Sequence, residues 1–124
     1  MDSSIAFREL LQKRTKEFVL RIIRLCQSLP SNWESEIIGK QLLRSATSVA
    51  ANYRAACRAK STADFINKLT IVEEECDESL YWMELLVESE ALPLHRLAAL
   101  MQEGDEILSI IVAALRTTRA RRLA

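Results

Sequence analysis

The carboxylates between residues 73 and 78 are the densest set of side chains in this sequence that could do chemistry. They are Glu73, Glu74, Glu75, Asp77 and Glu78. Glutamates on a helix can hold a di-iron centre inside a four-helix bundle, but that centre also requires two Glu-x-x-His pairs. His95 is the only histidine, and the residue three positions before it is Leu92. We therefore interpret the carboxylates as a solvated or ion-paired helix face.

The cysteines and glycines offer no alternative chemistry. Cys26, Cys57 and Cys76 lack the spacing of a zinc ligand set, and nothing pairs them with the histidine as a nucleophile would require. Their apolar-periodic positions indicate small buried thiols in a reducing compartment. The two glycines, Gly39 and Gly104, are isolated, so there is no glycine-rich phosphate loop. We expect no catalytic residue, no metal and no cofactor.

Charge is unevenly distributed along a chain whose formal net charge is zero. Residues 1–60 carry eleven Lys or Arg against five Asp or Glu, residues 61–115 carry two against twelve, and the last nine residues add four arginines. Basic side chains on one face could meet the phosphates of a nucleic acid. The candidates are Arg14, Arg21, Arg24, Arg54, Arg58, Lys60, Arg119, Arg121 and Arg122. The alternative is that they pair with the carboxylates of residues 73–78, within one bundle or across a subunit boundary.

Apolar residues recur at alternating steps of four and three along most of the chain, which predicts amphipathic helices. These helices cover about residues 4–28, 32–59, 62–90 and 93–118, and from Arg116 onward we expect a basic C-terminal tail that frays. The first helix has the seam Phe7, Leu11, Thr15, Phe18, Ile22, Leu25 and Leu29. Short connections place successive helices antiparallel. Residues 1–124 are therefore predicted to form one all-α domain, an antiparallel up-down-up-down four-helix bundle.

Prolines and capping residues mark the predicted boundaries. Pro30 ends the first helix, and Pro93 suits the first position of the fourth, where its missing N–H costs nothing. Two capping boxes precede the middle helices, Ser31 with Glu34 and Ser61 with Asp64. No apolar run approaches the roughly 18 residues that cross a bilayer, and the polar start lacks a signal-peptide layout. We expect a cytoplasmic protein without a membrane partner.

Two helix interiors contain unusual residues. The second helix carries a polar seam, Gln41, Arg44, Ser48 and Asn52, beside Ser45. Buried side chains of this kind need hydrogen-bond partners, and Asn52 is expected to fix the register of the bundle rather than to bind a ligand. Gly104 falls on the seam of the fourth helix. A glycine there predicts a close contact or a bend, because glycine inside a helix costs about 1 kcal/mol relative to alanine.

The stretch QLLRSATSVAAN at residues 41–52, followed by Lys60-Ser61 and Asp64-Phe65, resembles the four helix bundle proteins of the 23S rRNA intervening-sequence family. The resemblance extends over most of the chain, including Leu29-Pro30 and the glutamate-rich third helix. Where the usual pattern continues as Ile-Ala-Glu-Gly, this chain has Tyr53-Arg54-Ala55-Ala56. The glycine is missing, so the second helix should run on toward Lys60.

The resemblance implies a homopentameric barrel of bundles. The family includes the accessory variability determinant of diversity-generating retroelements, a basic barrel that binds nucleic acid and a reverse transcriptase, whereas the role of most members is unknown. We therefore expect a non-enzymatic, oligomeric accessory factor that binds nucleic acid or protein. Its expected partners are itself, RNA or DNA, and a protein such as a reverse transcriptase. The alternative is a purely structural or protein-interaction module that binds no nucleic acid.

Overall fold

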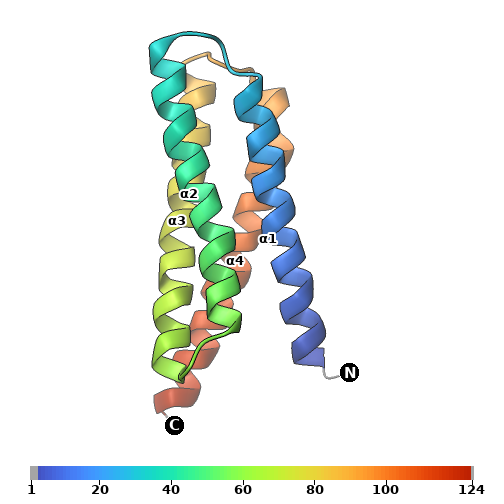
Figure 1. Cartoon of the computed structure of the whole chain (residues 1–124), viewed down its shortest axis with the longest axis vertical. Helices are drawn as coiled ribbons and strands as arrows, with labels where there is room; N and C mark the ends of the chain where they lie inside the picture. The colour runs from blue at the N-terminus through green and yellow to red at the C-terminus, as the bar shows by residue number, and fades with distance from the viewer. Residues whose placement is uncertain (1–2, 124) are drawn as a thin grey trace.

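Four helices account for most of residues 3–123, the part of the chain that this computed structural model describes. They are α1 Ser3–Gln27, α2 Trp33–Cys57, α3 Thr62–Glu88 and α4 Leu94–Leu123. Successive helices run in opposite directions and are joined by short turns at alternating ends of the molecule (Figure 1). The predicted all-α, up-down-up-down four-helix bundle is confirmed. None of the described helices is long and apolar enough to cross a membrane.

The start of α3 matches its predicted capping box, and the start of α2 does not. The hydroxyl of Ser61 accepts the N–H of Asp64 at 3.0 Å, and the Asp64 carboxylate accepts the N–H of Lys60 at 3.2 Å. Before α2 the cap is Asn32 rather than Ser31, and its side chain accepts the N–H of Ser35 at 2.9 Å. Since Asn and Ser cap about equally well, the turn that follows Pro30 decides which of them reaches the helix.

The C-terminal end of α4 also differs from the sequence prediction. The helix continues to Leu123, so the expectation that the chain frays from Arg116 is wrong. Arginine, alanine and leucine are strong helix formers, and cations near a helix C-terminus interact favourably with its dipole. Arg119 also donates to the hydroxyl of Thr70 on α3 at 3.3 Å. The C-terminal arginines therefore lie on a helix rather than on a tail.

The core runs along the bundle and draws on all four helices. On α1 the predicted seam is buried at Leu11, Thr15, Phe18, Ile22 and Leu25, and the Thr15 hydroxyl donates to the carbonyl of Leu11 at 2.9 Å. Phe7, in contrast, is 49% exposed. The N-terminal half of α1 diverges from the other three helices (Figure 1), which explains why this seam position is not covered.

Small and polar residues line the contact between α2 and α3. The hydroxyls of Ser45 and Ser79 lie 2.8 Å apart in a buried hydrogen bond. Asn52 donates to the carbonyl and hydroxyl oxygens of Ser48, both at 2.9 Å. These bonds remain within α2, so the structure does not support the prediction that Asn52 sets the register between helices. The buried hydrogen bond that joins the two helices is the one between Ser45 and Ser79.

Gly104 is a close-contact point, as predicted. A Cβ at this position would lie 3.0 Å from a terminal methyl of Leu80 and 3.4 Å from two atoms of the Phe18 ring. The thiol of Cys76 donates to the Gly104 carbonyl at 3.3 Å. Burial is the main cause that raises the pKa of Cys76 to about 12, so this thiol stays protonated. Cys26 and Cys57 are half-buried, and all three cysteines are free.

Candidate nucleic-acid interface

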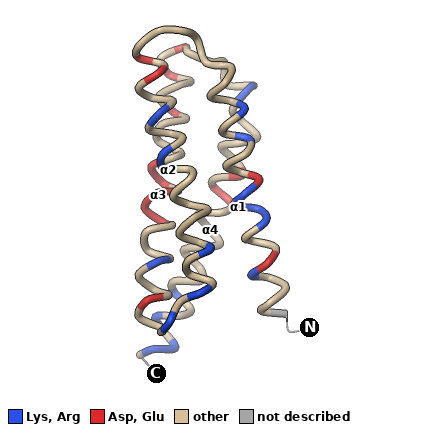
Figure 2. The backbone as a smooth tube through the Cα atoms, viewed as in Figure 1, with Lys and Arg blue, Asp and Glu red and all other residues tan. Residues whose placement is uncertain are grey.

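One end of the bundle concentrates positive charge. Because the helices are antiparallel, the C-terminal ends of α2 and α4 lie beside the N-terminal end of α3 (Figure 1). The parts of α2, α3 and α4 near this end, with the turn between α2 and α3, are residues 50–68 and 110–123, and they contain eight Lys or Arg residues and one acidic residue, Asp64. The N-terminal part of α1 lies at the same end and adds Arg8 and Glu9. Lys and Arg dominate there in Figure 2. We call this surface the basic end; it consists of Arg54, Arg58, Lys60, Lys68, Arg116, Arg119, Arg121 and Arg122.

The basic end brings together six of the nine cations that sequence analysis singled out. Arg54 comes from the last turn of α2, Arg58 and Lys60 follow directly after that helix, and the arginines at 119, 121 and 122 come from α4; all six are exposed. Within residues 3–123, the ion pairs are formed by other arginines, so none of these six is neutralised by a described carboxylate. The surface is therefore free to meet an anion.

Two members of the basic end, Lys68 and Arg116, were missed by sequence analysis. Lys68 is isolated among acidic and uncharged residues, whereas Arg116 belongs to the arginine-rich C-terminal segment and was assigned to the basic tail rather than to the candidate phosphate contacts. The antiparallel register could have found both, because it places the first turns of α3 beside the last turns of α4. Local charge patterns do not contain that information.

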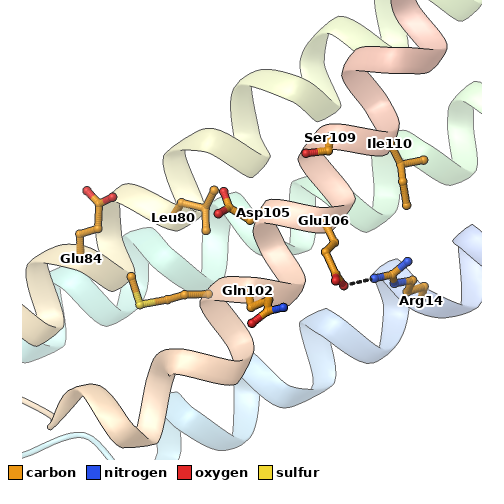
Figure 3. A pocket seen from close by; sticks show the side chains of 9 residues that line it. Arg14, Leu80, Glu84, Gln102, Asp105, Glu106, Ser109 and Ile110 are labelled. Carbon is orange, nitrogen blue, oxygen red and sulfur yellow. Dashed lines mark hydrogen bonds and ion pairs between the residues drawn. The ribbon is translucent and has the colours of Figure 1, made fainter.

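Arg14 does not join this surface. Its guanidinium binds Glu103 of α4 through two hydrogen bonds of 2.8 Å and also donates to Glu106 at 2.6 Å. Figure 3 shows Arg14 extending from α1 toward Glu106. Two carboxylates neutralise its charge, so the structure favours ion pairing over phosphate binding at this position. Arg21 and Arg24 lie in the C-terminal half of α1, away from the basic end.

The ion pair of Arg14 makes stability depend on pH. Its hydrogen bond is the largest cause that holds the pKa of Glu103 below the ordinary value of 4.5, while burial opposes this shift. A lowered folded-state pKa stabilises the protein above the unfolded-state pKa, and that contribution is lost as pH falls through the folded-state value. Arg14→Gln should therefore lower the free energy of unfolding by about 1 kcal/mol near neutral pH and flatten the loss of stability in acid.

Urea unfolding of the wild type and of Arg14→Gln, at neutral pH and between about pH 5 and pH 3, measures both effects. Arg24→Gln is the matched control, since it removes an exposed arginine of the same helix that has no ion-pair partner among residues 3–123. An Arg14→Gln protein as stable as this control at neutral pH would contradict the prediction.

Arg44 of the predicted polar seam points outward and links α2 to α3. It pairs with Glu75 at 3.0 Å and Glu78 at 2.7 Å, and it is the main cause that lowers the pKa of Glu78. Gln41 accepts a longer hydrogen bond of 3.4 Å from Arg44, and Trp82 donates to Glu78 at 3.1 Å. Part of the carboxylate cluster is thus ion-paired inside the chain, which is the alternative that the sequence left open.

The acidic side chains of α3 and α4 are spread along the surface rather than gathered at one point. A hollow of about 920 Å³ lies over α3 and α4, and Figure 3 shows Glu84, Asp105 and Glu106 spaced along it, with Glu106 turned toward Arg14. Nowhere in the described part of the chain do three His, Cys, Asp or Glu side chains come together as a metal site would require. His95 is exposed near the start of α4.

The fold and the basic end define a small all-α bundle protein with a strongly polarised charge distribution. The chain belongs to the 23S rRNA-intervening sequence protein family, whose sequence model matches residues 10–113. It is also similar to a crystal structure of a protein with unknown function from the S23 ribosomal protein family of Bacteroides thetaiotaomicron VPI-5482. The two are 35% identical with a TM-score of 0.79, over 85% of this chain and 97% of that chain. No curated protein matches the sequence.

These comparisons confirm the family that the motif at residues 41–52 indicated. They assign no activity, because the solved relative is itself described as a protein of unknown function. The link to retroelement accessory proteins stays a prediction.

Proposed function

We propose that this protein is a non-enzymatic accessory factor that binds RNA or DNA through its basic end. The observation that carries the proposal is the gathering of exposed cations from α2 and α4 on one surface without carboxylate partners among residues 3–123. Lys and Arg side chains that contact phosphates release counterions, which supplies most of the sequence-independent affinity for nucleic acid.

The zero net charge of the chain does not oppose this proposal. A helix of about 25 residues is roughly 37 Å long, whereas charges in physiological salt are screened over about 8 Å. Carboxylates in the middle of the bundle are therefore about two screening lengths away from a phosphate bound at the basic end, and those at the far end are more than four. The charge of the basic end, rather than the net charge of the chain, therefore determines the attraction to a phosphate.

Salt dependence tests the proposal. The affinity for a labelled oligonucleotide should fall steeply between about 50 and 200 mM salt. The double variant Arg54→Ala/Arg58→Ala should bind more weakly and lower the slope of log K against log salt by about 0.7–0.9 for each lost phosphate contact. The matched control is Arg21→Ala/Arg24→Ala, which also removes two positive charges but does so in the C-terminal part of α1, away from the basic end. No binding at about 50 mM salt, or equal losses in both double variants, would contradict the proposal.

Self-association is the second part of the proposed function, with a homopentamer expected from the family resemblance. Large apolar side chains are exposed away from the basic end: Trp33 is 74% and Ile37 45% exposed, one turn apart on α2. Exposed apolar groups that lie together commonly mark interaction surfaces, and repeated head-to-tail contacts can close a ring. Light scattering measures the assembly, and a monomer at micromolar concentration would contradict it.

Those same apolar residues favour the alternative function, a protein-interaction module without nucleic-acid binding. A protein partner such as a reverse transcriptase would then dock on the surface around Trp33 and Ile37 rather than on the basic end. The alternative predicts a partner whose capture survives nuclease treatment and is lost in Trp33→Ala. Nuclease-sensitive capture that is unaffected by Trp33→Ala would favour the nucleic-acid role.

A further inference from the structure

A groove of about 1080 Å³ opens at the basic end, between the N-terminal half of α1 and the ends of the other three helices. The divergence of α1 from its neighbours toward the N-terminus is visible in Figure 1. The wall of the groove includes buried apolar side chains such as Leu11, Leu69 and Ile111, and the partly exposed rings of Phe7 and Phe65. The interior of the groove is thus apolar and partly aromatic.

Every charged residue that lines the groove is a cation. These residues are Arg8 from α1, Lys60 from the turn after α2, and Arg121 and Arg122 from α4. Tyr53 lies in the wall with Cys57 beside it, and burial is the main cause that raises its pKa, with Arg8 opposing. The tyrosine is therefore neutral. A ligand that fits this surface combines apolar or flat groups with negative charge.

The number and placement of the cations distinguish the possible ligands. A fatty acid would offer one carboxylate, whereas the groove has four cations and the adjoining surface adds Arg54, Arg58 and Arg116. A duplex would offer many phosphates, but its bases are stacked inside and would leave an apolar, aromatic wall uncovered. A single strand offers both features at once. Proteins that bind single strands combine a positively charged groove with aromatic rings on which bases stack.

We propose that the groove at the basic end binds single-stranded nucleic acid, with bases against Phe7 and Phe65 and phosphates on Arg8, Lys60 and Arg121. This inference rests on the proposed function and specifies the form of nucleic acid that the protein takes. The cations outside the groove then continue the path of the backbone past the end of α2. Sequence preference is weak, because stacking uses the face that every base possesses.

The test compares one strand alone and in a duplex. The probes are an oligodeoxythymidylate of about 16 nucleotides and the same strand annealed to oligodeoxyadenylate, each titrated with full-length protein. The wild type should bind the single strand at least about tenfold more tightly than the duplex. Phe7→Ala should weaken single-strand binding by about tenfold and leave duplex binding unchanged. Phe7→Trp keeps an aromatic ring at this position and should bind the single strand about as tightly as the wild type.

Leu10→Ala is the matched control. Leu10 is 62% exposed on the same helix and is absent from the groove wall, so its loss removes an apolar side chain without removing a stacking ring. Circular dichroism verifies that each variant is folded. As a measurement on the unaltered protein, photocrosslinking with bromodeoxyuridine in the strand should label Phe7, Tyr53 or Phe65.

The outcomes separate this inference from the proposed function. Equal affinity for strand and duplex, with Phe7→Ala behaving like Leu10→Ala and crosslinks outside the groove, would overturn the single-strand inference. If Arg54→Ala/Arg58→Ala still weakens binding in that case, the proposed function stands. If the wild type binds neither probe at low salt, the proposed function fails and the inference fails with it.

Discussion

Replacing Phe18 with alanine is expected to lower the free energy of unfolding by about 3–5 kcal/mol. Phe18 is 0% exposed, and its ring lies against Gly104 of α4. It is among the side chains that hold α1 on the bundle, and α1 packs less extensively on α4 than on α2. The cavity left by the ring would also remove dispersion contacts that small neighbouring side chains cannot replace.

Urea unfolding measures this change as a shift in the transition midpoint at constant slope. Leu10→Ala serves as the control, because an exposed position should change stability by no more than about 0.5 kcal/mol. A loss below about 1 kcal/mol in Phe18→Ala would mean that α1 is not docked on the bundle in solution as it is in the structure.

Replacing Gly104 with leucine should have the second largest effect, a loss of about 1–3 kcal/mol. A Cβ alone would already lie 3.0 Å from Leu80 and 3.4 Å from the ring of Phe18. A leucine adds three more carbons in the same direction, so α4 would have to move away from α1 and α3. Gly104→Ala should stay within about 1 kcal/mol of the wild type, since the gain in helix propensity offsets a contact that the Leu80 side chain can relieve by rotating.

Combining the two large changes tests whether both act at one contact. In Phe18→Ala/Gly104→Leu the added side chain can occupy part of the cavity, so the double variant should lose less stability than the two single variants together. Denaturant unfolding of all four proteins in the cycle measures the coupling. Simple additivity would show that Phe18 and Gly104 do not share a site and would contradict the packing described above.

Helix positions followed closely from local patterns in the chain. Steps of four and three residues predicted the buried face of α1 from Leu11 to Leu25, because burial along a helix depends on a period of 3.6 residues. The structure differs from these predictions at helix ends and where a helix leaves its neighbours, because the spacing of apolar residues does not specify either feature. Asn32 replaced Ser31 as the cap, α4 continued past Arg116, and Phe7 was left exposed because α1 diverges from its neighbours.

The candidate site was only partly predictable. Arg14 and Arg54 look alike in the sequence, since each lies in a basic segment at a helical position. In the structure Arg14 is neutralised by Glu103 and Glu106, whereas Arg54 is exposed and has no ion-pair partner within residues 3–123. The difference depends on which helix lies beside each arginine. The groove near Phe7 was equally hidden, because it exists between helices rather than along one.

The sequence by itself determined the helical class, the up-down order of the helices and the family, through apolar spacing, short connections and the motif at residues 41–52. These features depend on interactions between residues that are close along the chain. The tertiary structure alone decided which cations are neutralised, that Lys68 and Arg116 join the basic end, and that an apolar groove opens there. Each of these depends on the distance between side chains that are far apart in sequence, and only the packing of the four helices sets that distance.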